Sequence, residues 1–200
     1  MFYKVRVQPV TETPKEEIIA LSFEKNIKIK DTVARMAKIV FTRDHFSIYV
    51  VEDGEEEKMI KDSDGSTKIP LYISFMEKKP VIGESAAKVA EKNPDFVVYD
   101  LMKLCSINFE NADSKWPFKL IKNYNNEILV EFETSNGPRR AGPDFLLAIV
   151  FNHCLKLIEK ETGEKLEEIG IKFEGFEKKE DFVPCFKKAG EKINVKLNFL

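Results

Sequence analysis

Four consecutive polar residues carry the side chains of this sequence that are best suited to chemistry. Thr42, Arg43, Asp44 and His45 supply a hydroxyl, a guanidinium, a carboxylate and an imidazole. A guanidinium and the N–H groups of a turn can hold a phosphate, whereas the Asp44 carboxylate repels one. Two interpretations stay open at this point: an ordinary solvated turn, and a weak anion or nucleotide site at Thr42, Arg43 and Asp44.

The segments on either side of these residues must position them. Residues 39–41 and 46–50 are mostly apolar and β-branched or aromatic, which predicts a strand, a turn and a second strand. The polar residues therefore lie at the tip of a hairpin.

The remaining candidates are one further histidine and three cysteines. His153 and Cys154 adjoin on a predicted helix, where neighbouring positions do not face each other. We therefore expect a hydrogen-bonded surface histidine there and no nucleophilic pair. Cys105, Cys154 and Cys185 are odd in number and far apart in the sequence, which favours a reducing cytosol over a disulfide framework. No C-x-x-C pair exists, so the sequence predicts no zinc site.

Length and charge narrow the class of protein. Two hundred residues suit one domain, or one domain with a small appendage, and 43% of them are hydrophobic. The 32 basic and 34 acidic residues nearly balance, which argues against nucleic acid as a partner. No run of 18 apolar residues exists and the N-terminus lacks the apolar core of a signal peptide, so we expect a cytoplasmic chain without a transmembrane helix.

Strands and helices alternate along the rest of the sequence, which indicates an α/β fold. Residues 1–37 predict a strand and a helix capped by Thr13, and residues 38–200 form the main domain. Pro184 is expected to damage the helix in which it lies. The other predicted elements are a strand at 69–75, a helix at 83–93, a helical turn at 100–104, a hairpin at 118–134, a helix at 142–163, strands at 168–176 and 193–199, and the helix at 179–192.

An ordered set of short motifs resembles the first lobe of the ATPase domain of the 70-kDa heat-shock chaperones, over residues 38–199. The matching residues are Ile82-Gly83, Ala86-Ala87-Lys88, Asn93-Pro94, Val98-Tyr99-Asp100, Leu104, Phe109, Trp116-Pro117-Phe118, the hairpin at 118–133, Pro143-Asp144-Phe145 and the segment 187–199. The resemblance implies half of an actin-like (ribonuclease H-like) ATPase domain, with a mixed sheet and packed helices. In that family the nucleotide lies between this lobe and a second one, and the sequence ends just after the last strand of the first.

The resemblance also places the family's chemistry on particular residues. Its phosphate loop, I-D-L-G-T-T, falls on residues 39–44, so Thr42 replaces the glycine, and Arg43 and Asp44 replace the threonines. Its catalytic lysine, in D-A-K-R, falls on Met102, and Lys103 takes the place of the arginine. A phosphate cradle needs close backbone approach and cations on the developing charge, so we expect no catalytic residue and no bound metal.

These replacements lead us to expect a divergent chaperone fragment without ATP turnover. It would act as a non-catalytic interaction module that binds a protein partner through the face covered by the second lobe in relatives. Two alternatives remain: an ATP-binding chaperone domain that retains weak binding of ATP with magnesium, and a decayed gene product without a specific function.

Overall fold

The computed structural model describes residues 36–51, 56–106 and 115–200. All of them lie in the second of two units, 1–33 and 34–200, into which the chain divides. The strand and capped helix predicted within residues 1–37 lie outside the described residues, apart from Met36 and Ala37, which begin the first strand.

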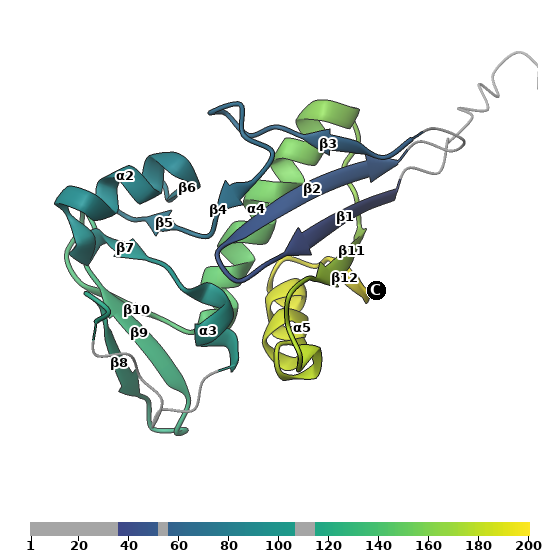
Figure 1. The fold of residues 1–200 in the computed structure, drawn as a ribbon. Helices are drawn as coiled ribbons and strands as arrows, with labels where there is room; N and C mark the ends of the chain where they lie inside the picture. The colour runs from purple at the N-terminus through teal and green to yellow at the C-terminus, as the bar shows by residue number, and fades with distance from the viewer. Residues whose placement is uncertain (1–35, 52–55, 107–114) are drawn as a thin grey trace, which may run out of the picture. The chain divides into compact units, whose positions relative to one another are not determined.

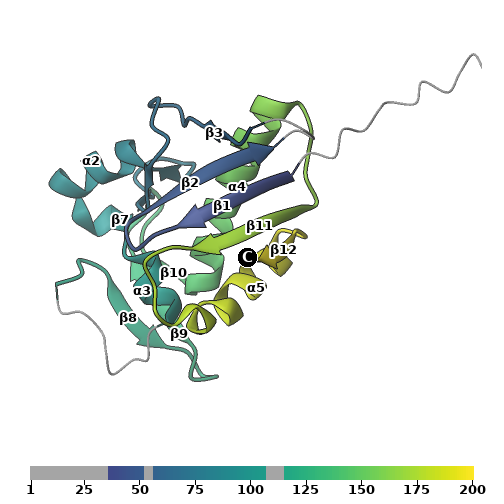
Figure 2. The ribbon, with the colours of Figure 1, turned by 45° about the vertical axis from the view of Figure 1, so that its right-hand side comes forward.

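A central sheet organises the described residues (Figures 1 and 2). Its strands follow the order β12-β11-β1-β2-β3, with β4 paired to β2 beside β3. The pairs β1–β2 and β2–β3 are antiparallel, whereas β1–β11 and β11–β12 are parallel. The predicted mixed sheet is thus confirmed. The strands span Met36–Phe41 (β1), His45–Val51 (β2), Lys58–Ile60 (β3), Ile69–Pro70 (β4), Glu168–Phe173 (β11) and Lys196–Phe199 (β12).

Two helices, α4 (Pro143–Thr162) and α5 (Val183–Lys192), lie side by side against one face of this sheet (Figure 2). The strand register explains why that face is apolar. Ile39 lies opposite Ile48 on one neighbouring strand and Ile171 on the other, and all three are fully buried. Side chains two residues apart on a strand share a face, so the same alternation buries Phe41 beside them.

Helix α4 begins and ends as its sequence predicts. Pro143 is its first residue, and Gly163 ends it in the left-handed conformation with φ 72°, which glycine adopts without steric cost. The expectation for α5 was wrong in one respect, because Pro184 does not damage the helix. It lies in the first turn of α5, where the missing N–H group has no partner to lose.

Two small three-stranded sheets complete the fold. One has the order β6-β5-β7 and packs against helix α2, and the other has the order β10-β9-β8. The strand predicted at 69–75 is divided into β4 and β5, because Pro70 has no N–H and the Leu71 N–H donates to the Asp44 carbonyl outside the ladder. The remaining elements are β5 (Ile73–Ser74), β6 (Val81–Ile82), α2 (Glu84–Lys92), η1 (Pro94–Phe96), β7 (Val97–Val98), α3 (Leu101–Ser106), β8 (Lys119–Lys122), β9 (Ile128–Phe132), β10 (Arg139–Ala141) and η3 (Lys179–Asp181).

Candidate functional site

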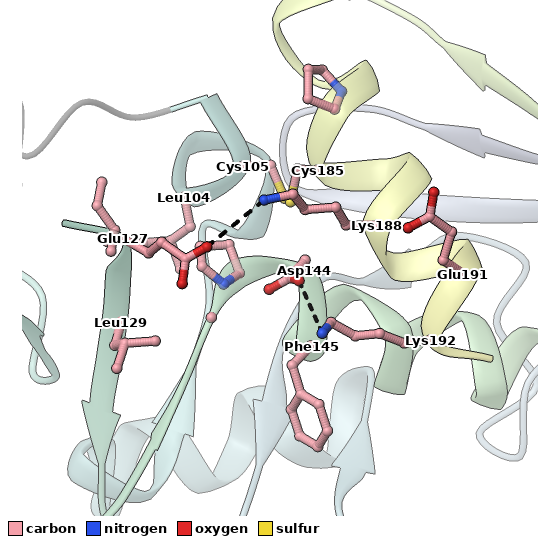
Figure 3. Close-up of a pocket in the computed structure, with 14 residues that line it drawn as sticks. Leu104, Cys105, Glu127, Leu129, Asp144, Phe145, Cys185, Lys188, Glu191 and Lys192 are labelled. Atoms are coloured by element: carbon pink, nitrogen blue, oxygen red, sulfur yellow. Dashed lines mark hydrogen bonds and ion pairs between the residues drawn. The ribbon is translucent and has the colours of Figure 1, made fainter. Parts of the chain in front are cut away.

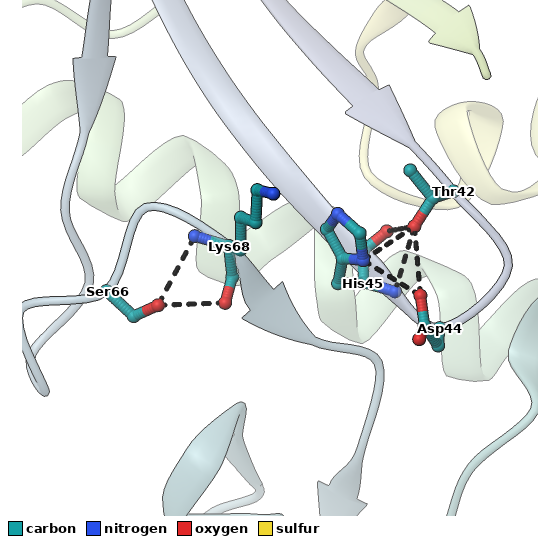
Figure 4. A network of polar contacts seen from close by, with 5 residues as sticks. All are labelled: Thr42, Asp44, His45, Ser66 and Lys68. Carbon is teal, nitrogen blue, oxygen red and sulfur yellow. Dashed lines mark hydrogen bonds and ion pairs between the residues drawn. The ribbon is translucent and has the colours of Figure 1, made fainter.

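The turn between β1 and β2 is held by hydrogen bonds among its own residues (Figure 4). The Thr42 hydroxyl lies 2.9 Å from the His45 carbonyl oxygen and 2.8 Å from His45 Nδ1. The backbone N–H of His45 donates to the same hydroxyl over 3.2 Å. Asp44 Oδ1 lies 2.8 Å from His45 Nδ1. The polar atoms of Thr42 and Asp44 therefore serve the turn.

The charge of Asp44 is a fixed feature of this turn. The hydrogen bond from His45 lowers the pKa of the Asp44 carboxyl; burial opposes this effect, and the Thr42 hydroxyl adds to it. The Asp44 side chain is 81% exposed. Since its pKa lies below the ordinary value, the carboxylate is ionised at neutral pH and repels an approaching anion.

Arg43 differs from its neighbours because it lines a cavity of about 470 Å³. The cavity joins the turn to helix α3 and to the segment between β11 and α5. Its wall contains two cationic side chains, one carboxylate, one hydroxyl and three apolar side chains: Arg43, Lys103, Asp100, Ser106, Met102, Phe176 and Phe182. The structure thus places the predicted residue Arg43 on the same cavity as Met102 and Lys103.

Helix α3 and the residues around it determine which groups reach this cavity. Asp100 precedes α3 with φ 56°, and its Oδ2 accepts a 2.8 Å hydrogen bond from the Trp116 indole N–H. Lys103 Nζ lies 5.0 Å from the centroid of the Trp116 ring, a cation–π contact. Met102 is 1% exposed and belongs to the hydrophobic core. Met102, which the resemblance places at the family's catalytic lysine, therefore serves packing.

These groups do not fit a magnesium–triphosphate site. A triphosphate needs backbone N–H groups at close range and several cations, but the N–H of Thr42 donates to His45 and the Asp44 carboxylate lies in the same turn. Among the described residues, no three histidine, cysteine or acidic side chains gather in a way that could hold a metal ion. Arg43 and Lys103 give the cavity two cations that can attract an anion.

The expectation of a hydrogen-bonded surface histidine at position 153 was wrong. His153 is half-buried, and its Nε2 atom is buried without a hydrogen-bond partner among the described residues. Burial lowers the pKa of His153, with Lys156 acting in the same direction and Asp62 against it. Cys154 is fully buried, and burial raises its pKa. A histidine and a thiol in these states do not form a nucleophilic pair.

The sequence did not indicate that two of the cysteines meet. Cys105 of α3 and Cys185 of α5 both line a second cavity (Figure 3). They are 80 residues apart, and no local pattern connects them. Only the packing of α3 against α5 shows the pair.

Within the described residues, none of the helices combines the length and the apolar composition that crossing a membrane requires.

Comparison with known proteins finds the family that the sequence motifs resemble, and the match covers most of the described residues. A family model described as Hsp70 protein matches residues 44–174. A heat shock protein of Pyricularia oryzae is 28% identical over 131 residues, which are 63% of this chain and 21% of that protein. A ribosome-associated molecular chaperone is 27% identical in Eremothecium gossypii and 26% in Saccharomyces cerevisiae, in each case over 119 residues, 57% of this chain and 19% of the relative. The chain spans about a fifth of the length of these curated relatives.

Proposed function

Because the chain belongs to the Hsp70 protein family, we propose that residues 38–200 act as a chaperone interaction module that does not turn over ATP. The observation that carries the proposal is the position of Met102. Phosphoryl transfer requires a cation on the developing charge, and the thioether of Met102 is 1% exposed within the core. No proton or positive charge is available at that atom.

The turn at residues 42–45 supports the same proposal. A phosphate loop must offer unpaired N–H groups to its ligand, whereas Thr42 N–H donates to the His45 carbonyl at 2.9 Å. The Asp44 carboxylate adds a negative charge beside them. The hairpin frame is kept, and its hydrogen-bonding groups are used internally.

The proposed partner is a protein that contacts the surface around Arg43, Lys103 and Phe176. These residues line an open cavity whose wall is both charged and apolar. Protein–protein interfaces combine the same two features, in an apolar centre and a polar rim. In the family this side of the lobe faces a second lobe. The relatives described above are a heat shock protein and two ribosome-associated chaperones, so we propose a cytoplasmic role beside other proteins.

A second candidate is weak binding of nucleotide without turnover. The specific observation in its favour is the pair of cations, Arg43 and Lys103, on one cavity of about 470 Å³. Either cation could hold a phosphate oxygen. The Asp44 and Asp100 carboxylates beside them keep the expected affinity low.

Phosphate release from Mg-ATP tests the main proposal on the full chain, with a complete Hsp70 ATPase domain as the positive control. We expect no release above that of buffer alone. Release that is abolished by both Arg43→Ala and Lys103→Ala would overturn the proposal, because it would place turnover in this cavity.

A further inference from the structure

Two cysteines face each other at the back of a cavity of about 740 Å³ (Figure 3). Cys105 lies near the end of α3, and Cys185 lies in the first turn of α5. The start of α4 and the strand β9 form the rest of the wall, with Asp144 and Leu129 among the lining residues. The pair therefore sits where three helices and a strand meet.

The two sulfurs are close enough to react with each other. Cys105 Sγ and Cys185 Sγ are 3.0 Å apart, and both residues carry free thiols. A disulfide bond is about 2.05 Å long, so closing it needs a movement of roughly 1 Å. Both side chains are half-buried on an open cavity, so a small oxidant can reach them.

The third cysteine provides an internal comparison. Cys154 is fully buried in α4 and does not line this cavity. A buried thiol away from solvent and from other sulfurs is inert. If an oxidant reacts with Cys105 and Cys185 but not with Cys154, the reason is the exposure of the two thiols and the short distance between them.

We propose that Cys105 and Cys185 form a redox-controlled site, in which hydrogen peroxide or a related hydroperoxide converts the two thiols into a reversible disulfide that links α3 to α5. The neighbouring sulfur of Cys185 raises the pKa of the Cys105 thiol, and burial adds to this effect. Cys105 therefore stays protonated in the reduced pair, and we assign the second step of the reaction to its sulfur.

The reaction balances in two steps. The Cys185 sulfur attacks one peroxide oxygen; the O–O bond breaks, Cys185 becomes a sulfenic acid, and the hydroxide released takes up the proton of the Cys185 thiol to form water. The Cys105 sulfur then attacks the Cys185 sulfur, the S–S bond forms and the S–O bond breaks. The departing hydroxide takes the Cys105 proton. Two thiols lose two electrons and two protons, and hydrogen peroxide becomes two water molecules.

The bridge would act on the smaller cavity as well, because α3 lines both. Met102 and Lys103 line the smaller cavity, while Cys105, two residues further along the same helix, lines the larger one. Linking α3 to α5 fixes the helix that carries Lys103. Oxidation would thus restrict the surface around Arg43 and Lys103.

Mass spectrometry of the full chain after hydrogen peroxide treatment tests the proposal. Thiols that remain are alkylated, and the chain is digested without reduction. We expect an intact mass lower by about 2 Da and one cross-linked peptide that contains Cys105 and Cys185. The melting temperature should rise by roughly 5–15 °C, since the bridge closes a loop of about 80 residues, and dithiothreitol should reverse both changes.

Three variants make the test specific. Cys105→Ser and Cys185→Ser should each lose the mass change and the rise in melting temperature, whereas Cys154→Ala should keep both. The cross-linked peptide is sought in the unaltered chain, so the result does not depend on how a variant folds. Peroxide products that are only sulfinic or sulfonic acids, or disulfides between copies of the chain, would overturn the proposal. A Cys105–Cys185 bridge that lowers the melting temperature would also overturn it.

Discussion

Replacing Phe186 with alanine should remove ring contacts that hold α5 against strands β1 and β11 of the central sheet. The Phe186 ring is fully buried. Its centroid lies 5.1 Å from that of Phe41, 5.6 Å from that of Phe151 and 4.8 Å from that of Phe173, with near-perpendicular rings in each case. Phe41 ends β1, directly before the turn that carries Arg43.

The expected loss of unfolding free energy follows from the burial of Phe186 and from its ring contacts. A fully buried phenylalanine reduced to alanine costs about 3–5 kcal/mol of unfolding free energy. At roughly 2–4 °C per kcal/mol for a chain of this size, the melting temperature should fall by about 6–20 °C. Phe186→Leu keeps most of the apolar volume and loses the edge-to-face contacts, so we expect about 1–2 kcal/mol.

Urea denaturation followed by circular dichroism measures these differences. Tyr124→Ala is the matched control, because Tyr124 is 97% exposed and its loss should change stability by less than about 0.5 kcal/mol. A loss below about 1 kcal/mol for Phe186→Ala would refute the view that this aromatic cluster positions the hairpin.

Three further predictions test other parts of the structure. Thr42→Val should cost about 1–2 kcal/mol in urea denaturation, because it removes the hydroxyl that holds the turn, whereas Arg43→Ala should cost under about 0.5 kcal/mol; equal losses would contradict this. Gly190→Ala should cost about 1–3 kcal/mol, since a Cβ there would lie 2.8 Å from the Val195 carbonyl oxygen; an unchanged urea midpoint would count against it. Burial lowers the pKa of His153, so the unfolded chain takes up a proton at higher pH than the folded one, and stability should fall as pH drops through about 6.5. His153→Gln should make the melting temperature, measured by differential scanning fluorimetry, depend less on pH between pH 7.5 and 5. An unchanged dependence on pH would refute the assignment of this effect to His153.

Much of the fold could be predicted because its signals are local. The hairpin at 118–134 follows from the Asn125-Asn126 turn, and α4 from Pro143 and Gly163. The family match then confirms the expected actin-like half-domain. Pro184 was misjudged because a proline disrupts a helix interior but suits its first turn, and no local signal marked the start of α5.

Residues of the candidate site could be proposed from the sequence only where the order of the family motifs fixed the alignment. The resemblance assigned Arg43 to the phosphate loop and Met102 to the position of the catalytic lysine, and only the structure shows that both line the same cavity. Nothing in the sequence showed that His45 would use the polar groups of Thr42 and Asp44, because those bonds depend on the geometry of the turn. The Cys105–Cys185 contact, across 80 residues, depends on helix packing and leaves no local pattern.

A thermal-shift titration of the full chain with Mg-ATP tests the central claim most directly. A site filled at 100 times its dissociation constant adds about 2.7 kcal/mol, equivalent to a shift of roughly 5–11 °C. With Met102 in the core and the turn closed on itself, the shift at millimolar ATP should stay below about 1 °C. A saturable shift of several degrees that both Arg43→Ala and Lys103→Ala abolish would contradict the account.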